Sequence, residues 1–232
     1  MSETSENYDA IAKVYDDKIH SGYREKIQDQ IVFTTLDEII GEGELHILDA
    51  GGGTGHYSLP YAKKGHRITI LDISSKMLEG ADSNARAMNV SNLVEIIYGD
   101  MSNTSLPDES FDFVMCHLAL CHVNGPLLAL QEFHRILCKD GVLSLIVENK
   151  EFFSLRHAFL GNLDQALKNQ MKEKLEIELS GLGTLRTFRR EELLSMLVKT
   201  NLKPMKIIGL RILSDYLYYQ NREPPKDLES LK

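Results

Sequence analysis

A glycine-rich turn directly after a short apolar run constrains this chain more than any other feature. The run Leu45–Ala50 has the length of a buried strand, and Gly51, Gly53 and Gly55 follow it at alternate positions. Glycine lets the backbone turn tightly and approach a ligand closely, and the N–H groups at the start of a following helix bind polar or anionic groups. A helix is expected to start near His56. The sequence therefore predicts a strand–turn–helix unit that binds a nucleotide.

The spacing of these glycines argues against two common nucleotide motifs. The dinucleotide fingerprint needs its third glycine at the position where this chain has His56. The phosphate-binding loop needs a lysine after its last glycine, and none follows Gly55. The remaining pattern is acidic-x-Gly-x-Gly-x-Gly, which begins at Asp49. A nicotinamide dehydrogenase is therefore a distant alternative.

Strand-like and helix-like segments alternate around the glycine turn. Apolar positions at helical spacing predict two helices before residue 41, after a frayed tail over residues 1–6. The expected strands after the turn are 67–71, 94–98, 111–116 and 142–148. The expected helices between them are 74–88, with Ser74 as the N-cap, and 126–137. This alternation with short connections predicts an α/β fold, with a mostly parallel sheet and helices on both faces.

The alternation breaks after the fifth expected strand. The segment 152–179 is long, polar-rich and expected to be helical; a helix at 191–199 and a strand at 204–213 follow. Insertions at the carboxyl ends of parallel strands lie over the ligand crevice. We therefore expect residues 150–190 to form a helical cap above the site.

Acidic residues end the two strands that follow the glycine turn. Asp72 can accept hydrogen bonds from a ribose diol, and Ile73 follows it. Asp100 can accept from the exocyclic amine of adenine, and Met101 can pack on the ring. For Asp72 alone, an acid at a helix N-terminus is the structural alternative. Three consecutive strands thus end at the glycine turn, at Asp72 and near Asp100, and this combination favours a nucleoside site.

Composition narrows the class of protein further. The chain has 232 residues, which suits one domain, and its formal net charge of −8 excludes a generally basic nucleic-acid-coating protein. The three cysteines form no CxxC pair, so we expect no disulfide framework and no metal site. The polar N-terminus and strand-length apolar runs predict no secretory signal and no membrane span. A reducing, cytoplasmic setting is expected.

Several of these motifs together resemble the class I S-adenosylmethionine-dependent methyltransferases. They are the segments 49–55, 65–72, 99–101, 111–114 and 135–141. The resemblance covers roughly residues 7–220. It implies a Rossmann-like methyltransferase fold with S-adenosylmethionine as the methyl donor, held by Asp49, the three loop glycines, Asp72, Ile73, Asp100 and Met101. The implied organisation is a single domain over 1–232: N-terminal helices at 7–44, a donor-binding core at 45–149, the cap at 150–190 and a C-terminal part of the core at 191–220.

Further segments resemble, within this family, bacterial enzymes that esterify a carboxylate on the wobble uridine of tRNA. They include Asn7–Ala12, Leu160–Asn162 and Gly209–Arg211. This likeness implies that Asn149 and Arg211 face the acceptor. It makes tRNA the leading partner, with a small-molecule O- or N-methyltransferase as the alternative. A donor-binding regulatory protein without catalysis is an alternative of another class.

The remaining candidates come from residue chemistry. Arg24 can pair with the carboxylate of the donor, or be a solvated helix residue. His117 ends the fourth core strand and can contact the donor or act as a base, with a structural histidine as the equal alternative. Arg156 and Arg211 can orient an anionic acceptor, because a buried guanidinium needs a counter-charge, or they can pair with acids of the chain itself, such as Asp215 or Glu148. Tyr15 completes the expected acceptor site. The catalytic candidates are His117, Asn149 and Arg211.

Overall fold

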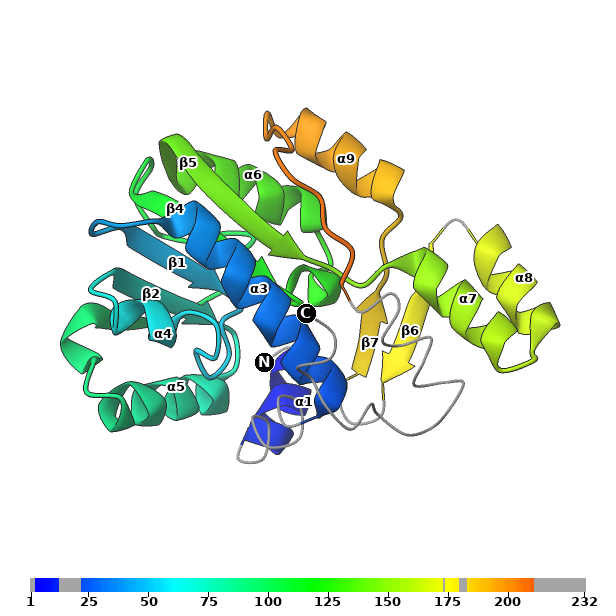
Figure 1. The fold of residues 1–232 in the computed structure, drawn as a ribbon, viewed down its shortest axis with the longest axis horizontal. Helices are drawn as coiled ribbons and strands as arrows, with labels where there is room; N and C mark the ends of the chain where they lie inside the picture. Colours follow the sequence, from blue (N-terminus) through cyan, green and yellow to red (C-terminus); the bar gives the residue numbers. More distant parts are fainter. Residues whose placement is uncertain (1–2, 13–21, 173, 180–182, 211–232) are drawn as a thin grey trace.

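The computed structural model of this chain describes residues 3–12, 22–172, 174–179 and 183–210 (Figure 1). Its main sheet has five parallel strands in the order β3-β2-β1-β4-β5. Their bounds are β1 His46–Ala50, β2 Arg67–Asp72, β3 Val94–Tyr98, β4 Phe111–His117 and β5 Leu137–Ile146. The predicted α/β fold with a parallel sheet is confirmed.

Helices cover both faces of this sheet (Figure 1). On one face lie α3 (Tyr23–Ile40), α4 (Leu59–Ala62) and α5 (Ser75–Ala87), and on the other α6 (Pro126–Ile136) and α9 (Arg190–Lys199). Two short 3-10 turns, Ser91–Leu93 and η3 (Leu120–His122), follow α5 and β4. The central strands β1, β2 and β4 are buried between these helices, so both of their faces are apolar.

Alternation along each strand divides the core into two layers. In β1, Ile47 packs into the cluster of α3 and α5, whereas Leu48 packs into the cluster of α6 and α9. In β4, Phe113 and Val114 divide in the same way. Successive strand residues point to opposite faces, so this pattern fixes which helices each strand supports.

The predicted cap segment combines helices with a small antiparallel sheet. It contains α7 (Lys150–Phe159), α8 (Leu163–Met171), β6 (Glu176–Leu179) and β7 (Gly183–Arg186). The prediction of helix as far as 179 was wrong, because Glu-Ile-Glu-Leu at 176–179 alternates with a period of two and pairs with β7. The expected strand at 204–213 is absent from the described part, 204–210.

The N-terminal helix α1 (Glu3–Ile11) replaces the frayed tail expected over residues 1–6. It contacts α5 and β7, and so connects the glycine-turn half of the sheet to the cap. Polar side chains of α1 hold it there through hydrogen bonds.

The strand order predicts a ligand crevice at the carboxyl edge of the sheet. The chain runs outward from β1 through β2 to β3, and then returns to place β4 on the other side of β1. Ligands of open parallel sheets bind at such a reversal. We therefore expect the ligand crevice between the end of β1, which leads into the glycine turn, and the end of β4 at His117. Among the described helices, none has the length and apolar composition needed to span a membrane.

Candidate functional site

The three loop glycines serve different purposes. All three have positive φ angles, +73° at Gly51, +55° at Gly53 and +81° at Gly55. A Cβ at Gly51 would lie 2.3 Å from the Cβ of Ala119, and one at Gly55 would lie 2.8 Å from Leu59. A Cβ at Gly53 would meet no described atom within 4 Å. Gly51 and Gly55 thus allow close packing, whereas Gly53 borders open space at the crevice.

Asp72 anchors this turn. Its carboxylate accepts hydrogen bonds from the backbone N–H of Gly53 at 2.9 Å and of Ser74 at 2.8 Å. Burial raises the pKa of Asp72, while these N–H donors oppose that rise. The residue holds the turn and the start of α5, and each oxygen retains a second lone pair for a ligand.

Asp49 lies beneath the glycine turn, almost completely buried. A Cβ at Gly52 would lie 2.6 Å from its carboxyl carbon, so the turn packs directly on this side chain. Burial, with a smaller contribution from the charge of Asp72, raises the pKa of Asp49 from 3.8 to about 6. Its charged form is therefore costly in the folded chain.

This raised pKa predicts a pH-dependent effect of Asp49→Asn on stability. Between pH 3.8 and about 6 the folded chain retains a proton that the unfolded chain has lost, so the contribution of Asp49 to stability falls as the pH rises through that interval. Asparagine does not titrate. The urea midpoint of the variant should therefore increase relative to the original chain between about pH 4 and about pH 7.5. The control is Asp82→Asn on α5, where the Asp82 side chain is 45% exposed; an Asp49→Asn difference that stays constant with pH would contradict the prediction.

Asp100 and Met101 begin the loop between β3 and β4. Asp100 is exposed, and its Oδ1 accepts a hydrogen bond from Ser102 N at 2.7 Å. Met101 is buried, and its methyl group lies close to the Cα of Gly51, since a Cβ there would lie 2.8 Å from Met101 Cε. Met101 thus packs against the glycine turn, and Asp100 lies beside it at the same edge of the sheet.

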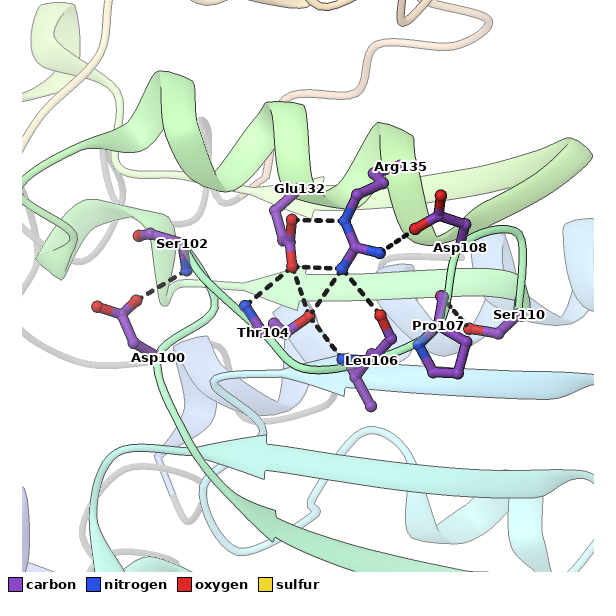
Figure 2. Close-up of polar contacts among 9 residues, drawn as sticks. All are labelled: Asp100, Ser102, Thr104, Leu106, Pro107, Asp108, Ser110, Glu132 and Arg135. Carbon is purple, nitrogen blue, oxygen red and sulfur yellow. Dashed lines mark hydrogen bonds and ion pairs between the residues drawn. The ribbon is translucent and has the colours of Figure 1, made fainter.

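Two residues of α6 hold this loop in place (Figure 2). Glu132 accepts hydrogen bonds from the backbone N–H of Thr104 at 2.9 Å and from its hydroxyl at 2.6 Å. Arg135 donates to Glu132 and to the carbonyl of Leu106, and forms an ion pair with Asp108 at the exposed end. The hydrogen bond from Arg135 is the largest cause that lowers the pKa of Glu132 to about 2.

Glu132→Gln should destabilise the chain far more than Asp108→Asn. The Glu132 side chain is 13% exposed, whereas that of Asp108 is 75% exposed and its ion pair is screened by water. We expect a loss of about 1–3 kcal/mol for the first variant and less than about 0.5 kcal/mol for the second. Urea unfolding at neutral pH measures both, and equal losses would contradict this account of the loop. The contribution of Glu132 should disappear as the pH falls from 4.5 towards about 2.

His117 lies at the other side of the crevice, at the end of β4. It is 9% exposed, and its Nε2 lies 2.9 Å from the hydroxyl of Ser144 on β5. Its ring meets that of Tyr57 edge to face, with centroids 5.0 Å apart. Burial lowers the pKa of His117 to about 3, so the imidazole is neutral at physiological pH.

Helix α1 spans the two sides of the crevice through three side chains. Ser5 donates to the carbonyl of Ile73 at 2.8 Å, and Asp9 accepts from the hydroxyl of Ser74 at 2.6 Å. On the β4 side, the hydroxyl of Tyr8 lies 2.9 Å from Nε2 of His122. The predicted residue Ile73 thus contributes a backbone carbonyl to this attachment.

The structure describes only some of the residues predicted to bind the acceptor. Asn149 is exposed at the start of α7, where its Oδ1 accepts from Glu151 N at 2.7 Å as a helix N-cap. Arg156 is half-buried on α7, and Arg24 belongs to α3, with its side chain outside the described part. Tyr15 and Arg211 lie outside the described residues. Of the nine predicted donor-side residues, the structure brings Asp49, Asp72 and Met101 into contact with the glycine turn and places the others at the same edge of the sheet. The nine are Asp49, Gly51, Gly53, Gly55, Asp72, Ile73, Asp100, Met101 and His117.

Sequence reasoning missed the polar residues that support this edge. Asp9 lies 65 positions from its partner Ser74, and Ser144 lies 27 positions from His117. Contacts over such separations leave no local spacing pattern. The one available signal is a polar residue inside the apolar strand Val142–Ile146, which is Ser144.

Comparison with known proteins agrees with this geometry. The chain matches the sequence profile of a methyltransferase domain over residues 48–145. It is 28% identical over 172 residues to the tRNA 5-carboxymethoxyuridine methyltransferase of Escherichia coli K12, an alignment that covers 72% of this chain and 66% of that protein. It is 30% identical over 146 residues to the ubiquinone/menaquinone biosynthesis C-methyltransferase of Rhodopseudomonas palustris, covering 61% and 57%.

The fold also matches solved structures. The structure of the [4+2]-cyclase SpnF has a TM-score of 0.71, with 20% identity, over 92% of this chain and 76% of that one. At this identity, the likeness concerns the fold alone. The chain spans 66% or less of the length of the two curated relatives named above.

Proposed function

Because the chain belongs to the class I S-adenosylmethionine-dependent methyltransferase family, we propose that it transfers a methyl group from S-adenosylmethionine to a carboxylate. The leading acceptor is the carboxylate of a modified wobble uridine in tRNA. The observation that supports donor binding, on which the transfer depends, is the positive φ at Gly53, which is held by Asp72 and borders open space at the reversal of strand order. This is the place where a sheet of this kind binds an adenosyl group.

The residues at this edge fit the donor. Asp72 would accept hydrogen bonds from the ribose, and Asp100 would accept from the adenine amine while Met101 packs on the ring. Gly53 would allow the backbone to approach the donor, with Gly51, Gly55, Asp49 and Ile73 shaping the turn around it. Arg24 would pair with the donor carboxylate. When bound, S-adenosylmethionine supplies a methyl group already activated on a cationic sulfur.

A carboxylate acceptor fits the chemistry of His117 better than an acceptor that must lose a proton. A general base works best when its pKa lies near the operating pH, whereas the pKa of His117 is lowered to about 3. A carboxylate is already ionised at neutral pH and needs no base. Its oxygen forms a bond to the methyl carbon as the bond from sulfur to that carbon breaks, which yields a methyl ester and S-adenosylhomocysteine.

The acceptor side of the proposal places the cap over the methyl group. Residues 150–190 follow β5 and contact η3 after β4 through β7, so they adjoin the crevice. We assign Tyr15, Asn149, Arg156 and Arg211 to the acceptor, with the arginines orienting its carboxylate. The support for tRNA is the sequence similarity to the Escherichia coli enzyme. The similarity to the quinone-biosynthesis enzyme supports a small-molecule acceptor as the second candidate.

The experiment uses the full chain with S-adenosylmethionine that carries a deuterated methyl group. One arm contains tRNA from cells that lack the wobble methyl ester, and the other contains a small-metabolite extract; mass spectrometry detects the label in nucleosides or metabolites. Gly53→Leu serves as the donor-site control. Label in an alkali-sensitive ester of a wobble nucleoside supports the proposal. Label in small metabolites alone selects the second candidate, and label in neither contradicts the methyl-transfer proposal.

A further inference from the structure

We propose that Ser144 fixes the tautomer of His117, so that the Nδ1–H of this buried histidine donates a hydrogen bond to a carboxylate oxygen of the bound ligand. The inference deepens the proposed function and rests on it, because it assigns a carboxylate to the crevice beside His117. Ser144 acts through His117 and is a positioning residue.

The strand register brings the two side chains together. In the parallel pair β4–β5, His117 is opposite Ile146 and Met115 is opposite Ser144, so His117 and Ser144 are diagonal neighbours. The Nε2 of His117 lies 2.9 Å from the hydroxyl oxygen of Ser144. The Nδ1 of His117 is buried without a hydrogen-bond partner among the described residues.

The hydroxyl of Ser144 decides which ring nitrogen holds the proton. Burial keeps the imidazole neutral, so one nitrogen donates and the other accepts. Within the described part of the chain, the hydroxyl has Nε2 of His117 as its one side-chain or backbone partner. A hydroxyl that donates to Nε2 satisfies its own hydrogen and the lone pair of that nitrogen. The proton of the neutral ring then resides on Nδ1.

The neighbouring tyrosine does not take this proton through its hydroxyl. Tyr57 donates from its hydroxyl to Asp29 at 2.8 Å and accepts there from Gln28 at 3.0 Å. It meets His117 through its ring instead, at 76° between the planes. An unpaired buried N–H costs free energy comparable to a lost hydrogen bond. A ligand oxygen at the crevice would remove that cost, and an ionised carboxylate would form the strongest such bond.

A second buried histidine provides an internal reference with the opposite tautomer. The backbone N–H of Leu45 donates to Nδ1 of His66 at 3.3 Å, so this Nδ1 is an acceptor and the proton lies on Nε2. Burial also lowers the pKa of His66 and keeps its ring neutral. His66 lies before β2, at the amino edge of the sheet, away from the crevice.

The experiment is nuclear magnetic resonance of the full chain labelled with ¹⁵N-histidine, in which the two tautomers have distinct nitrogen shifts. His117 should show protonated Nδ1, and His66 should show protonated Nε2. Ser144→Ala should shift the population of His117 towards the other tautomer, while Ser144→Thr, which keeps a hydroxyl, should retain it. His66 should be unchanged in both variants. A wild-type His117 protonated at Nε2 overturns the proposal, whatever the variants do.

Two additions then identify the source of the carboxylate. S-adenosylhomocysteine, which carries the amino-acid carboxylate of the donor, is added first, and 5-carboxymethoxyuridine is added to that complex. A downfield shift of the Nδ1 proton in the first step assigns the donor carboxylate, and a shift in the second step alone assigns the acceptor carboxylate. A proton that responds to neither overturns the inference.

Kinetics separate positioning from folding and from failure of the proposed function. For Ser144→Ala we expect about a tenfold rise in the KM of the ligand that shifts Nδ1, measured below the unfolding midpoint of the variant, and Ser144→Thr should restore most of the loss. An unchanged KM contradicts the positioning role. If S-adenosylhomocysteine shifts Nδ1 but tRNA is not methylated, the proposed acceptor fails while the assignment for His117 stands. If tRNA is methylated but Nδ1 does not respond, the proposed acceptor stands and the assignment for His117 fails.

Discussion

Replacement of Gly53 by leucine is expected to abolish donor binding while leaving the chain folded. The φ of +55° is strained for any residue with a Cβ, which costs about 1–3 kcal/mol. No described atom within 4 Å would clash with the new Cβ, so the fold tolerates the side chain. The leucine would instead fill the space that borders the turn. We expect donor affinity to fall by about 100-fold or more, or about 2.7 kcal/mol.

The matched control is Gly41→Leu at the end of α3. Gly41 has a similar φ of +64°, and a Cβ there would meet no described atom within 4 Å, but this glycine precedes β1 at the amino edge of the sheet. Urea unfolding should show that both variants fold, and calorimetry with S-adenosylmethionine should show weakened binding for Gly53→Leu alone. Normal donor binding by a folded Gly53→Leu chain would show that the glycine turn is structural.

Replacement of Asp72 by asparagine should weaken donor binding by about 1.5–3 kcal/mol, or about 10- to 150-fold. The amide keeps the size of the side chain and one oxygen that can accept from a backbone N–H. The amide loses the negative charge and one of the two acceptor oxygens. In the original side chain these oxygens accept from the N–H groups of Gly53 and Ser74, and they would also accept from the ribose. Calorimetric titration with S-adenosylmethionine measures the change directly.

Asp9→Asn distinguishes ribose binding from support of α5. Asp9 also accepts hydrogen bonds at the start of α5, from the hydroxyl of Ser74 and from Lys76 N at 3.1 Å, but we assign it no contact with the donor. Its effect on donor affinity should be smaller than about threefold. Equal losses in the two variants would reassign Asp72 from the ribose to the helix start.

The parts of the fold that could be predicted are those with a strong local pattern. Ser74 at the start of an amphipathic segment predicted its own role as N-cap, and its hydroxyl accepts from Met77 N at 3.1 Å. The apolar runs that end in Asp72 and Asp100 predicted β2 and β3. The hairpin of β6 and β7 was missed because the alternation in Glu176–Leu179 extends over only four residues, too few to stand out from the adjacent helical pattern.

The candidate site was predictable where chain order places residues at the strand ends, and not where tertiary contacts decide. Parallel strands bring Gly53, Asp72 and Asp100 to one edge whatever the details of packing. The N-cap contact of Asn149 is local to the start of α7. Whether Asn149 also contacts the acceptor depends on how the cap packs beside β5, which is a tertiary contact. The pairing of His117 with Ser144 required the register of two strands, which the sequence does not specify.

The most direct measurement of the central claim is a crystal structure of the full chain with S-adenosylhomocysteine. The account predicts the ribose hydroxyls within hydrogen-bond distance of Asp72, the adenine beside Asp100 and Met101, and the backbone of Gly53 against the donor. The sulfur should face the crevice between the ends of β1 and β4. Density for the ligand elsewhere, or a ribose turned away from Asp72, would contradict the account.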